Sequence, residues 1–306
     1  MTDNYDKVSL LLPMNGANNG TVFPDWGPIN ATVTRSGATL PTTVTAQSKF
    51  YGSSGLFPAV TGTQQQNHLR YTLPSAIGTQ PFTIRGWQRV GNTTDVYALL
   101  DTRYSTSGYV IANTDAGFLF YLRGPSSSLS FAYGAAPTLV NGTTAFSANT
   151  WHHVAVTRDG SNNLRLFLDG NLEATQAGVT NNFSNLFTSI GGLVAAQARA
   201  AQYVQDFELI IGEALHTASF TPPTRRIGTI SNAAVGASKI LDINGDPAER
   251  TVIAVPRSAP TRMFSDVSNA SGEFEIQAPA GVDHSVVALA DEATLYNDIV
   301  HRVIPE

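Results

Sequence analysis

The chain has 306 residues, a formal net charge of −5 and no cysteine, and 42% of its residues are hydrophobic while only 13% are charged. This composition is sufficient for packed cores and excludes global disorder, disulfide bonds and thiolate metal sites. No block of Lys or Arg occurs, so the charge pattern does not favour binding to nucleic acid. The apolar run at residues 8–12 is too short for a signal peptide or a membrane span, so we expect a protein made in the cytoplasm without membrane insertion.

Short segments in which apolar and polar residues alternate fill the first two-thirds of the chain, separated by Gly, Pro, Asn and Asp. This period of two predicts half-buried strands, and their regular spacing predicts an antiparallel sandwich. The Ala-rich residues 195–202 predict either a short helix or a long loop. The expected strands are residues 7–12, 43–47, 68–73, 80–88, 95–101, 108–112, 117–122, 128–133, 151–158, 163–169, 187–190 and 203–211.

The clearest pattern lies in residues 151–170. Apolar residues recur at every second position on both sides of the polar stretch 159–163, which predicts a hairpin. His152 and His153 are neighbours on its first strand, so their side chains should face opposite sides and cannot both bind one metal ion. We expect one histidine inside, hydrogen bonded to a backbone group, and the other outside.

The pattern changes near residues 220–226, where two prolines and two arginines follow an apolar strand. This predicts a boundary between a domain of residues 1–225 and a second domain of residues 226–306. The second domain is expected to be a compact Greek-key sandwich, with turns at residues 244–247 and 269–272. Its expected strands are residues 239–243, 250–256, 262–267, 273–277, 285–290 and 299–304.

Several segments of the first domain, in this order, resemble the laminin-G-like jelly roll of the concanavalin A type that is common in bacteriophage virion proteins. The matching segments are residues 5–16 (YDKVSLLLPMNG), 45–52 (TAQSKFYG), 81–87 (PFTIRGW), 151–170, 203–212 (YVQDFELIIG) and 220–223 (FTPP). The sequence departs from the family at Asn15, where an acid is usual, and at Arg85-Gly86, where an acid and a bulky residue are usual. Gly86 inside a strand predicts a bulge or a close backbone approach.

The second domain resembles a transthyretin-like or carboxypeptidase-regulatory-like, Ig-type β-sandwich. The matching segments are residues 245–255, 271–276, 286–290 and the ending 296–305 (YNDIVHRVIP). The order of the two modules is what the resemblance associates with a virion structural protein. It implies an all-β fold, in which a concanavalin A-like jelly roll precedes a small Ig-like sandwich.

Paired carboxylates are the first candidates for catalysis, because many glycosidases use the same sandwich and need two acids beside the scissile bond. Asp206 and Glu208 are two residues apart on one expected strand and should share a face. Glucanases of this fold usually add a third acid two residues later, where this chain has Ile210, and Glu213 is out of phase. No strained Gly-x-Ser-x-Gly turn of a serine nucleophile occurs either. We therefore predict no catalytic residue.

Glycan binding would use exposed aromatic rings beside amide and hydroxyl groups. The candidates are Trp26, Tyr104 and Tyr109, and the alternative is that they pack as lid and rim residues. No cofactor and no metal site are predicted. A structural Ca²⁺ stays open as an alternative, since suitable oxygen ligands occur singly at Asp101, Asp115, Asp159, Asn162 and Asn163.

The favoured hypothesis is a non-enzymatic bacteriophage virion structural protein, either a capsid decoration protein or a tail or fibre component. It would dock to other virion proteins as a homo-oligomer or symmetric array, with weak adhesion to host-surface glycans. Two alternatives remain: a carbohydrate-binding lectin or adhesin, and, least favoured, a glycoside hydrolase.

Overall fold

The structure is a computed structural model, and it describes residues 4–61, 67–103, 116–124, 128–134, 138–193, 198–232, 239–242, 244, 246–289, 299–303 and 305. The chain divides into two compact units. The larger unit comprises Ser9–Gly27 and Ala31–Pro222, and the smaller unit comprises Met1–Val8, Pro28–Asn30 and Pro223–Glu306. The division at Pro223 falls within the proline-rich segment 220–226. The grouping of residues 1–8 with the smaller unit has no signal in the composition.

The first sheet of the larger unit has eight strands in the order β13-β12-β11-β6-β15-β4-β3, with β1 paired to β15 outside this path. The predicted hairpin at 151–170 is confirmed, since Val154 lies opposite Leu168 and Val156 opposite Leu166. The strands are β1 (Val8–Leu12), β3 (Thr42–Val44), β4 (Ser54–Phe57), β6 (Phe82–Val90), β11 (Trp151–Arg158), β12 (Leu164–Leu168), β13 (Asn171–Gln176) and β15 (Gln202–Ile211).

The second sheet of the larger unit has seven strands in the order β10-β9-β8-β7-β14-β5-β2. Every strand pair recorded between its neighbours is antiparallel. The strands are β2 (Thr34–Ser36), β5 (His68–Thr72), β7 (Val96–Asp101), β8 (Phe118–Arg123), β9 (Ser128–Tyr133), β10 (Thr138–Ala145) and β14 (Phe187–Ile190).

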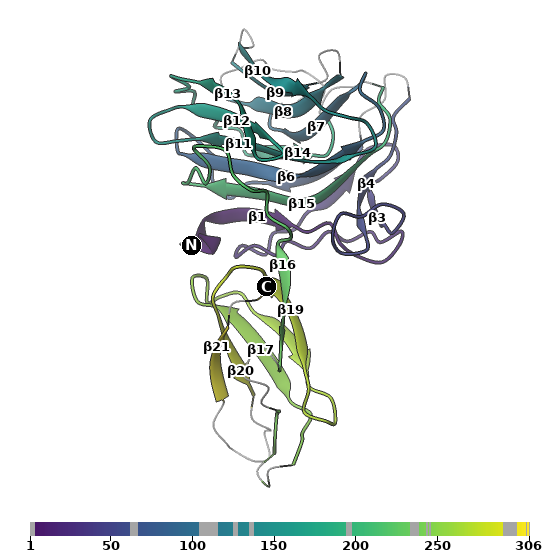
Figure 1. Cartoon of the computed structure of the whole chain (residues 1–306), viewed down its shortest axis with the longest axis vertical. Coiled ribbons are helices and arrows are strands. Elements are labelled where there is room, and N and C mark those ends of the chain that lie inside the picture. The colour runs from purple at the N-terminus through teal and green to yellow at the C-terminus, as the bar shows by residue number, and fades with distance from the viewer. Residues whose placement is uncertain are drawn as a thin grey trace. The chain divides into compact units, whose positions relative to one another are not determined.

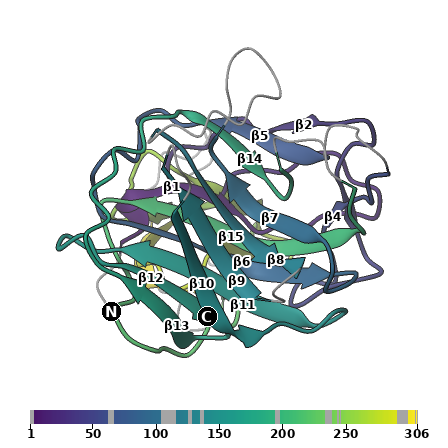
Figure 2. The same ribbon diagram turned by 90° about the horizontal axis from the view of Figure 1, so that it is seen from above.

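The two sheets lie face to face, as Figures 1 and 2 show from two directions. Alternate residues of each strand point between them and form one core, as the period of two predicted. Its centre is aromatic: the rings of Phe118 and Phe131 stack with centroids 4.8 Å apart, and Phe183 meets Phe118 edge-on at 4.9 Å. The fold class is therefore all-β, with the sandwich of the jelly roll in the larger unit.

Gly86 marks a β-bulge, as its place in a strand predicted. The register between β6 and β15 shifts between Gln205 and Glu208, so that Asp206 and Phe207 share the space opposite Gly86. A Cβ on Gly86 would come within 3.3 Å of the Phe207 Cα, and Asp206 has a φ of 51°. The bulge needs a small residue opposite it because the two backbones approach closely there.

The smaller unit begins with a single turn of 3-10 helix, η1 (Tyr5–Lys7), and its other described elements are strands. β16 pairs with β19 in one sheet, and a second sheet has the order β18-β17-β20-β21. Ile230, Ile276, Val252, Ala254 and Val286 are buried. The strands are β16 (Ile227–Ser231), β17 (Thr251–Pro256), β18 (Phe264–Val267), β19 (Glu275–Pro279), β20 (His284–Ala288) and β21 (Ile299–Val303).

The predicted turn at residues 269–272 is present, but it joins strands of different sheets. The Asn269 side chain accepts hydrogen bonds from the backbone N–H groups of Ser271 and Glu273 at 2.9 and 3.0 Å. It leads from β18 to β19, which pair with other strands. No described residue belongs to a helix long and apolar enough to cross a membrane.

Most predicted strands within the described residues are confirmed, with their ends shifted. The strand expected at 239–243 is wrong for residues 239–242, because Asp242 Oδ1 accepts the N–H groups of Asn244 and Asp246 and folds the chain into a turn. The strand expected at 108–112 lies outside the described residues, as do 195–197 of the Ala-rich segment, whose last residue begins β15. The sequence missed β2, β4, β10, β13 and β16.

Candidate functional site

The two acids with the strongest resemblance to a catalytic pair are each bound to another part of the protein. Glu208 is fully buried and accepts a hydrogen bond from Arg85 Nε at 2.6 Å. Asp206 accepts two hydrogen bonds from the Tyr51 hydroxyl, at 2.8 and 3.0 Å. The expectation that both acids share one face assumed a regular strand, and the bulge at this point removes that basis.

A neutral histidine contacts the guanidinium of Arg85, the cation of the Arg85–Glu208 pair. His216 Nε2 lies 3.2 Å from Arg85 Nη1, and its ring stacks on Phe220 with centroids 3.4 Å apart. Burial, and next the charge of Arg85, lower the pKa of His216 to about 4. The imidazole therefore accepts a hydrogen bond from the guanidinium and adds no charge at neutral pH. The arrangement stabilises a buried ion pair and leaves Glu208 without a free proton-transfer role.

His152 and His153 face opposite sides of β11, as predicted, but neither is outside. His153 is 1% exposed and lies between Trp87 and Phe220, with ring centroids at 5.3 and 5.6 Å. Both of its ring nitrogens are buried without a hydrogen-bond partner. Burial, followed by the charge of Arg85, lowers its pKa to about 3. The expected exposure was wrong because the segment that contains Phe220 packs over this face of the sheet.

The second histidine belongs to a Ser-His-Asp chain that the sequence analysis missed. His152 Nδ1 lies 2.7 Å from Asp169 Oδ2, and its Nε2 lies 3.0 Å from Ser147 Oγ. These distances match those of a serine nucleophile and its base. However, the backbone N–H of Ser147 also donates to His152 Nε2, at 3.1 Å. That amide competes with the Ser147 hydroxyl for the lone pair on Nε2, which a catalytic base needs to take up the hydroxyl proton. Because the amide already donates to His152, it is not available to stabilise a developing oxyanion.

The backbone position of Asp169 accounts for the Ser147–His152–Asp169 hydrogen bonds. Asp169 begins the turn between β12 and β13 with a φ of 51°, and Gly170 follows with a φ of 82°. Its Oδ1 accepts the backbone N–H of His153 at 2.8 Å. Burial acts to raise its pKa, and the hydrogen bonds from His152 and from the His153 amide outweigh burial, so the pKa is lowered. The Ser147–His152–Asp169 chain therefore ties two turns together and is structural.

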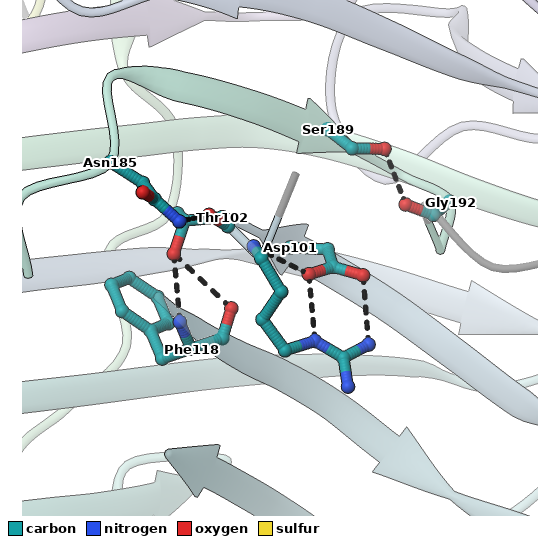
Figure 3. A network of polar contacts seen from close by, with 7 residues as sticks. Asp101, Thr102, Phe118, Asn185, Ser189 and Gly192 are labelled. Atoms are coloured by element: carbon teal, nitrogen blue, oxygen red, sulfur yellow. Dashed lines mark hydrogen bonds and ion pairs between the residues drawn. The ribbon is translucent and has the colours of Figure 1, made fainter. Parts of the chain in front are cut away.

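A second buried carboxylate lies at the end of β7, on the seven-stranded sheet (Figure 3). Asp101 is 0% exposed and holds Arg103 through two hydrogen bonds, from Nε at 3.0 Å and Nη2 at 2.9 Å. Next to it, the Thr102 hydroxyl accepts the Phe118 N–H at 2.9 Å, and the Thr102 carbonyl accepts from Asn185 at 2.8 Å. This network anchors the end of β7 to its surroundings, and its acid is paired with an arginine.

Two of the oxygen ligands considered for Ca²⁺, Asp101 and Asp159, are used in ion pairs. Asp159 accepts from the N–H groups of Ser161 and Asn163 and pairs with Arg165 at 2.6 Å. Burial acts to raise its pKa, and these bonds outweigh it and lower the pKa to about 2. Asp115 lies outside the described residues. Within the described part of the chain, no group of three or more His, Asp or Glu side chains is arranged to hold a metal ion.

Of the three predicted glycan-binding residues, the structure describes only Trp26. Trp26 is half-buried, and its backbone N–H donates to the Leu11 carbonyl at 2.8 Å. The neighbouring Asp25, 1% exposed, organises this turn by accepting the N–H groups of Leu11 and Gly27. Tyr104 and Tyr109 lie outside the described residues, so their role stays a prediction.

A different aromatic surface lies on the outward face of the eight-stranded sheet. Arg89 on β6 stands opposite Trp151 on β11 and Tyr203 on β15, and all three side chains are partly exposed. Sequence reasoning missed this row because its members come from three strands that are far apart in the chain. The signal was present only in part, as the alternation of Arg85, Trp87 and Arg89 along one face of β6.

Comparison with known proteins supports the fold. Residues 62–208 match the family model described as the concanavalin A-like lectin/glucanases superfamily, laminin-G type. The binding domain of botulinum neurotoxin serotype D is similar in structure, with a TM-score of 0.50, 12% identity and coverage of 98% of this chain and 79% of that chain. The binding domain of Paraclostridial Mosquitocidal Protein 1 has a TM-score of 0.50, 12% identity and coverage of 97% and 73%.

At these identities the likeness to the toxins concerns the fold alone. No curated protein matches the chain in sequence. The family match covers the strands that build most of the sandwich, including β6, β11 and most of β15. Over these residues the larger unit is therefore similar to the concanavalin A-like jelly-roll domains that this model describes.

Proposed function

We propose that the protein is a non-enzymatic structural and binding component of a bacteriophage particle. The observation that carries the non-enzymatic part is the buried Glu208, the strongest candidate acid, held at 2.6 Å by Arg85. A glycosidase needs two acids free to exchange protons or attack a sugar across a gap. Here one acid is locked in an ion pair, the other is bound to Tyr51, and Ile210 stands where glucanases usually carry a third acid.

The assignment to a phage particle rests on the sequence. A jelly roll followed by a module that resembles a transthyretin-like sandwich is an order associated with virion proteins. The low share of charged residues, 13%, fits a surface that must stay inert. The smaller unit would be that Ig-type sandwich: its described strands form two antiparallel sheets, and each sheet carries buried apolar residues.

In this role the protein works by shape and repetition. Made in the host cytoplasm, it would dock to capsid or tail subunits through one unit and present the other. Symmetry of the particle multiplies weak contacts into stable attachment and weak glycan contacts into adhesion. A free lectin or adhesin is the second candidate, and the partly exposed Trp151–Arg89–Tyr203 row favours it.

The test is a mass-spectrometric inventory of purified phage particles, with copy number relative to the major capsid protein. Tens to hundreds of copies would indicate decoration of the head or tail tube, and a few copies a vertex, baseplate or fibre. Absence from the particle would overturn the virion proposal. In parallel, the purified chain should release no reducing sugar from a broad polysaccharide panel. Release that is abolished in Glu208→Gln, with thermal unfolding showing that the variant is folded, would establish a glycosidase instead.

A further inference from the structure

We propose that the outward face of the eight-stranded sheet carries a binding site for an acidic oligosaccharide, formed by Trp151, Arg89 and Tyr203. This inference rests on the proposed binding function and adds the site and the chemical class of the ligand. The three residues form one transverse row, because Trp151 is in register with Arg89 and Arg89 with Tyr203. In an antiparallel sheet, residues directly opposite each other point to the same face.

The row belongs to the outward face, on the side away from the sandwich core. Val90 directly follows Arg89 and Val204 directly follows Tyr203, so their side chains point to the opposite face of the sheet, and both are core residues. Val154, three residues after Trp151, is a core residue as well. Two residues further along the strands, His153, Trp87 and Gln205 form the next row, and these are buried. Trp151, Arg89 and Tyr203 remain partly exposed. The aromatic row is thus the open end of a face that is otherwise covered.

The polar groups of this row have no partner within the described part of the protein. Arg89 lies over the Tyr203 ring, 5.4 Å from its centroid, and makes no ion pair there. Neither the Trp151 indole nor the Tyr203 hydroxyl makes a hydrogen bond to a described residue. By contrast, Arg85 and Arg103 of this unit are paired with carboxylates, and the buried Arg158 donates to backbone carbonyls. Arg89 therefore stands out as a cation placed between two rings with its donors available.

A second cation lies beside the row. Lys49 is exposed, and its Nζ lies 4.3 Å from the centroid of the Trp87 ring. Trp87 is the neighbour of Arg89 on the same face of β6. It makes no ion pair with a described residue. Two unpaired cations on an aromatic face, in a chain of net charge −5, favour an anionic ligand at this place over a neutral one.

The spacing of the rings fits a sugar chain. Trp151 and Tyr203 are separated by two strand spacings, about 10 Å in all. That distance suits stacking on alternate rings of an extended oligosaccharide, whose C–H faces cover the aromatic rings. Arg89 between them would bind the carboxylate of a uronic or sialic acid with its planar fork of N–H donors. Aromatic rings supply area and the guanidinium supplies selectivity for the acid.

The experiment is calorimetric titration of the full chain with oligosaccharides bearing glucuronate, galacturonate or sialate, each beside its carboxyl-reduced counterpart. We expect at least one acidic oligosaccharide to bind about tenfold more tightly than its reduced form, since hydrogen bonds to charged groups are strong. Arg89→Gln should remove that preference, and Tyr203→Ala and Trp151→Ala should weaken both forms. Tyr203→Phe, which keeps the ring, should retain most of the affinity.

The controls are matched to the chemistry. Arg257→Gln removes the same charge from a partly exposed position of the smaller unit, and Phe187→Ala removes a partly exposed ring from the other sheet. Both should bind like the unmodified chain, and unchanged thermal unfolding shows that a variant is folded. The inference is overturned if no acidic oligosaccharide binds at millimolar concentration, if reduced forms bind equally well, or if Arg89→Gln changes nothing.

Failure here is distinct from failure of the proposed function. Presence in phage particles without acidic-glycan binding would overturn this site and leave the virion role intact. Binding that depends on Arg89, in a protein absent from the particles, would establish the site and overturn the virion role.

Discussion

Arg85 and Glu208 face each other on neighbouring strands of the eight-stranded sheet, with Arg85 Nε 2.6 Å from Glu208 Oε2. Their side chains are 9% and 0% exposed, so both charges have been removed from water. Each charge is costly to bury, and the pair offsets that cost only while both partners are present. A glycosidase with this sandwich fold needs an acid that is available for catalysis, whereas Glu208 is part of an internal ion pair.

The first prediction concerns this pair. Glu208→Leu leaves the Arg85 charge uncompensated and should destabilise the protein by about 3–5 kcal/mol. The double variant Arg85→Met/Glu208→Leu should recover most of that loss, because no buried charge remains. Urea unfolding of the two variants and of Arg85→Met measures the coupling. Additive effects of the two single substitutions would show that the residues act independently.

The second prediction concerns pH. His153 has a folded-state pKa of about 3, while the unfolded chain takes up the proton near the usual value of 6.5. Stability from this residue is therefore complete above about pH 6.5 and is lost as the pH falls toward 3. The loss amounts to about 2 kcal/mol at pH 5. His216, with its pKa lowered to about 4, acts in the same direction.

The variant His153→Phe isolates this effect. The ring still packs against Trp87 and Phe220, but two buried nitrogens without hydrogen-bond partners disappear. We expect the variant to be more stable than the original chain at pH 7 by about 1 kcal/mol. Its free energy of unfolding should also fall less between pH 7.5 and 5, measured by urea titration at each pH. An unchanged pH profile would mean that His153 titrates normally in the folded protein.

The third prediction separates structure from catalysis in the Ser147–His152–Asp169 chain. The protein should hydrolyse an activated acetate ester no faster than its Ser147→Ala variant does. Asp169→Ala should cost about 1–3 kcal/mol of stability, because the His152 side chain and the His153 N–H both lose their acceptor. Ser147→Ala should cost less, since its amide still bonds to His152. Ester hydrolysis abolished by Ser147→Ala would instead identify a serine hydrolase.

Much of the fold follows from local patterns. The alternation in 151–170 predicts a hairpin because one face of each strand must enter the core, and Gly86 predicts a bulge because only a small residue tolerates the close backbone. The edge strands β10 and β13 were missed for the converse reason. Both are largely exposed, and an exposed strand has no need of alternating apolar residues.

The candidate site was less accessible to sequence reasoning. Asp206 and Glu208 are conspicuous in the sequence, but nothing near them in the chain reveals Arg85 or Tyr51 as partners. The Trp151–Arg89–Tyr203 row depends on strand order and register. Its strands, β11, β6 and β15, are neighbours in the sheet but do not follow one another in the sequence. Residues brought together by long-range pairing carry no periodic signal of their own.

The last prediction concerns the segment that covers His153. The Phe220 N–H donates to the Gly170 carbonyl at 2.8 Å, and Gly170 has a φ of 82°. A Cβ at Gly170 would lie 2.0 Å from the Phe220 carbonyl oxygen, whereas one at Gly178, with a φ of 73°, would meet nothing within 4 Å. Both replacements by Ala carry the backbone cost of a left-handed residue, about 1 kcal/mol.

Gly178→Ala should therefore lose only that amount of stability, and Gly170→Ala should lose clearly more, because Phe220 must move. Displacing Phe220 should also let water reach His153, whose pKa would rise from about 3 toward its usual value. Urea unfolding measures the first effect, and NMR titration of the histidine ring protons measures the second. Equal stability losses with an unchanged His153 pKa would mean that Phe220 does not keep water from this histidine.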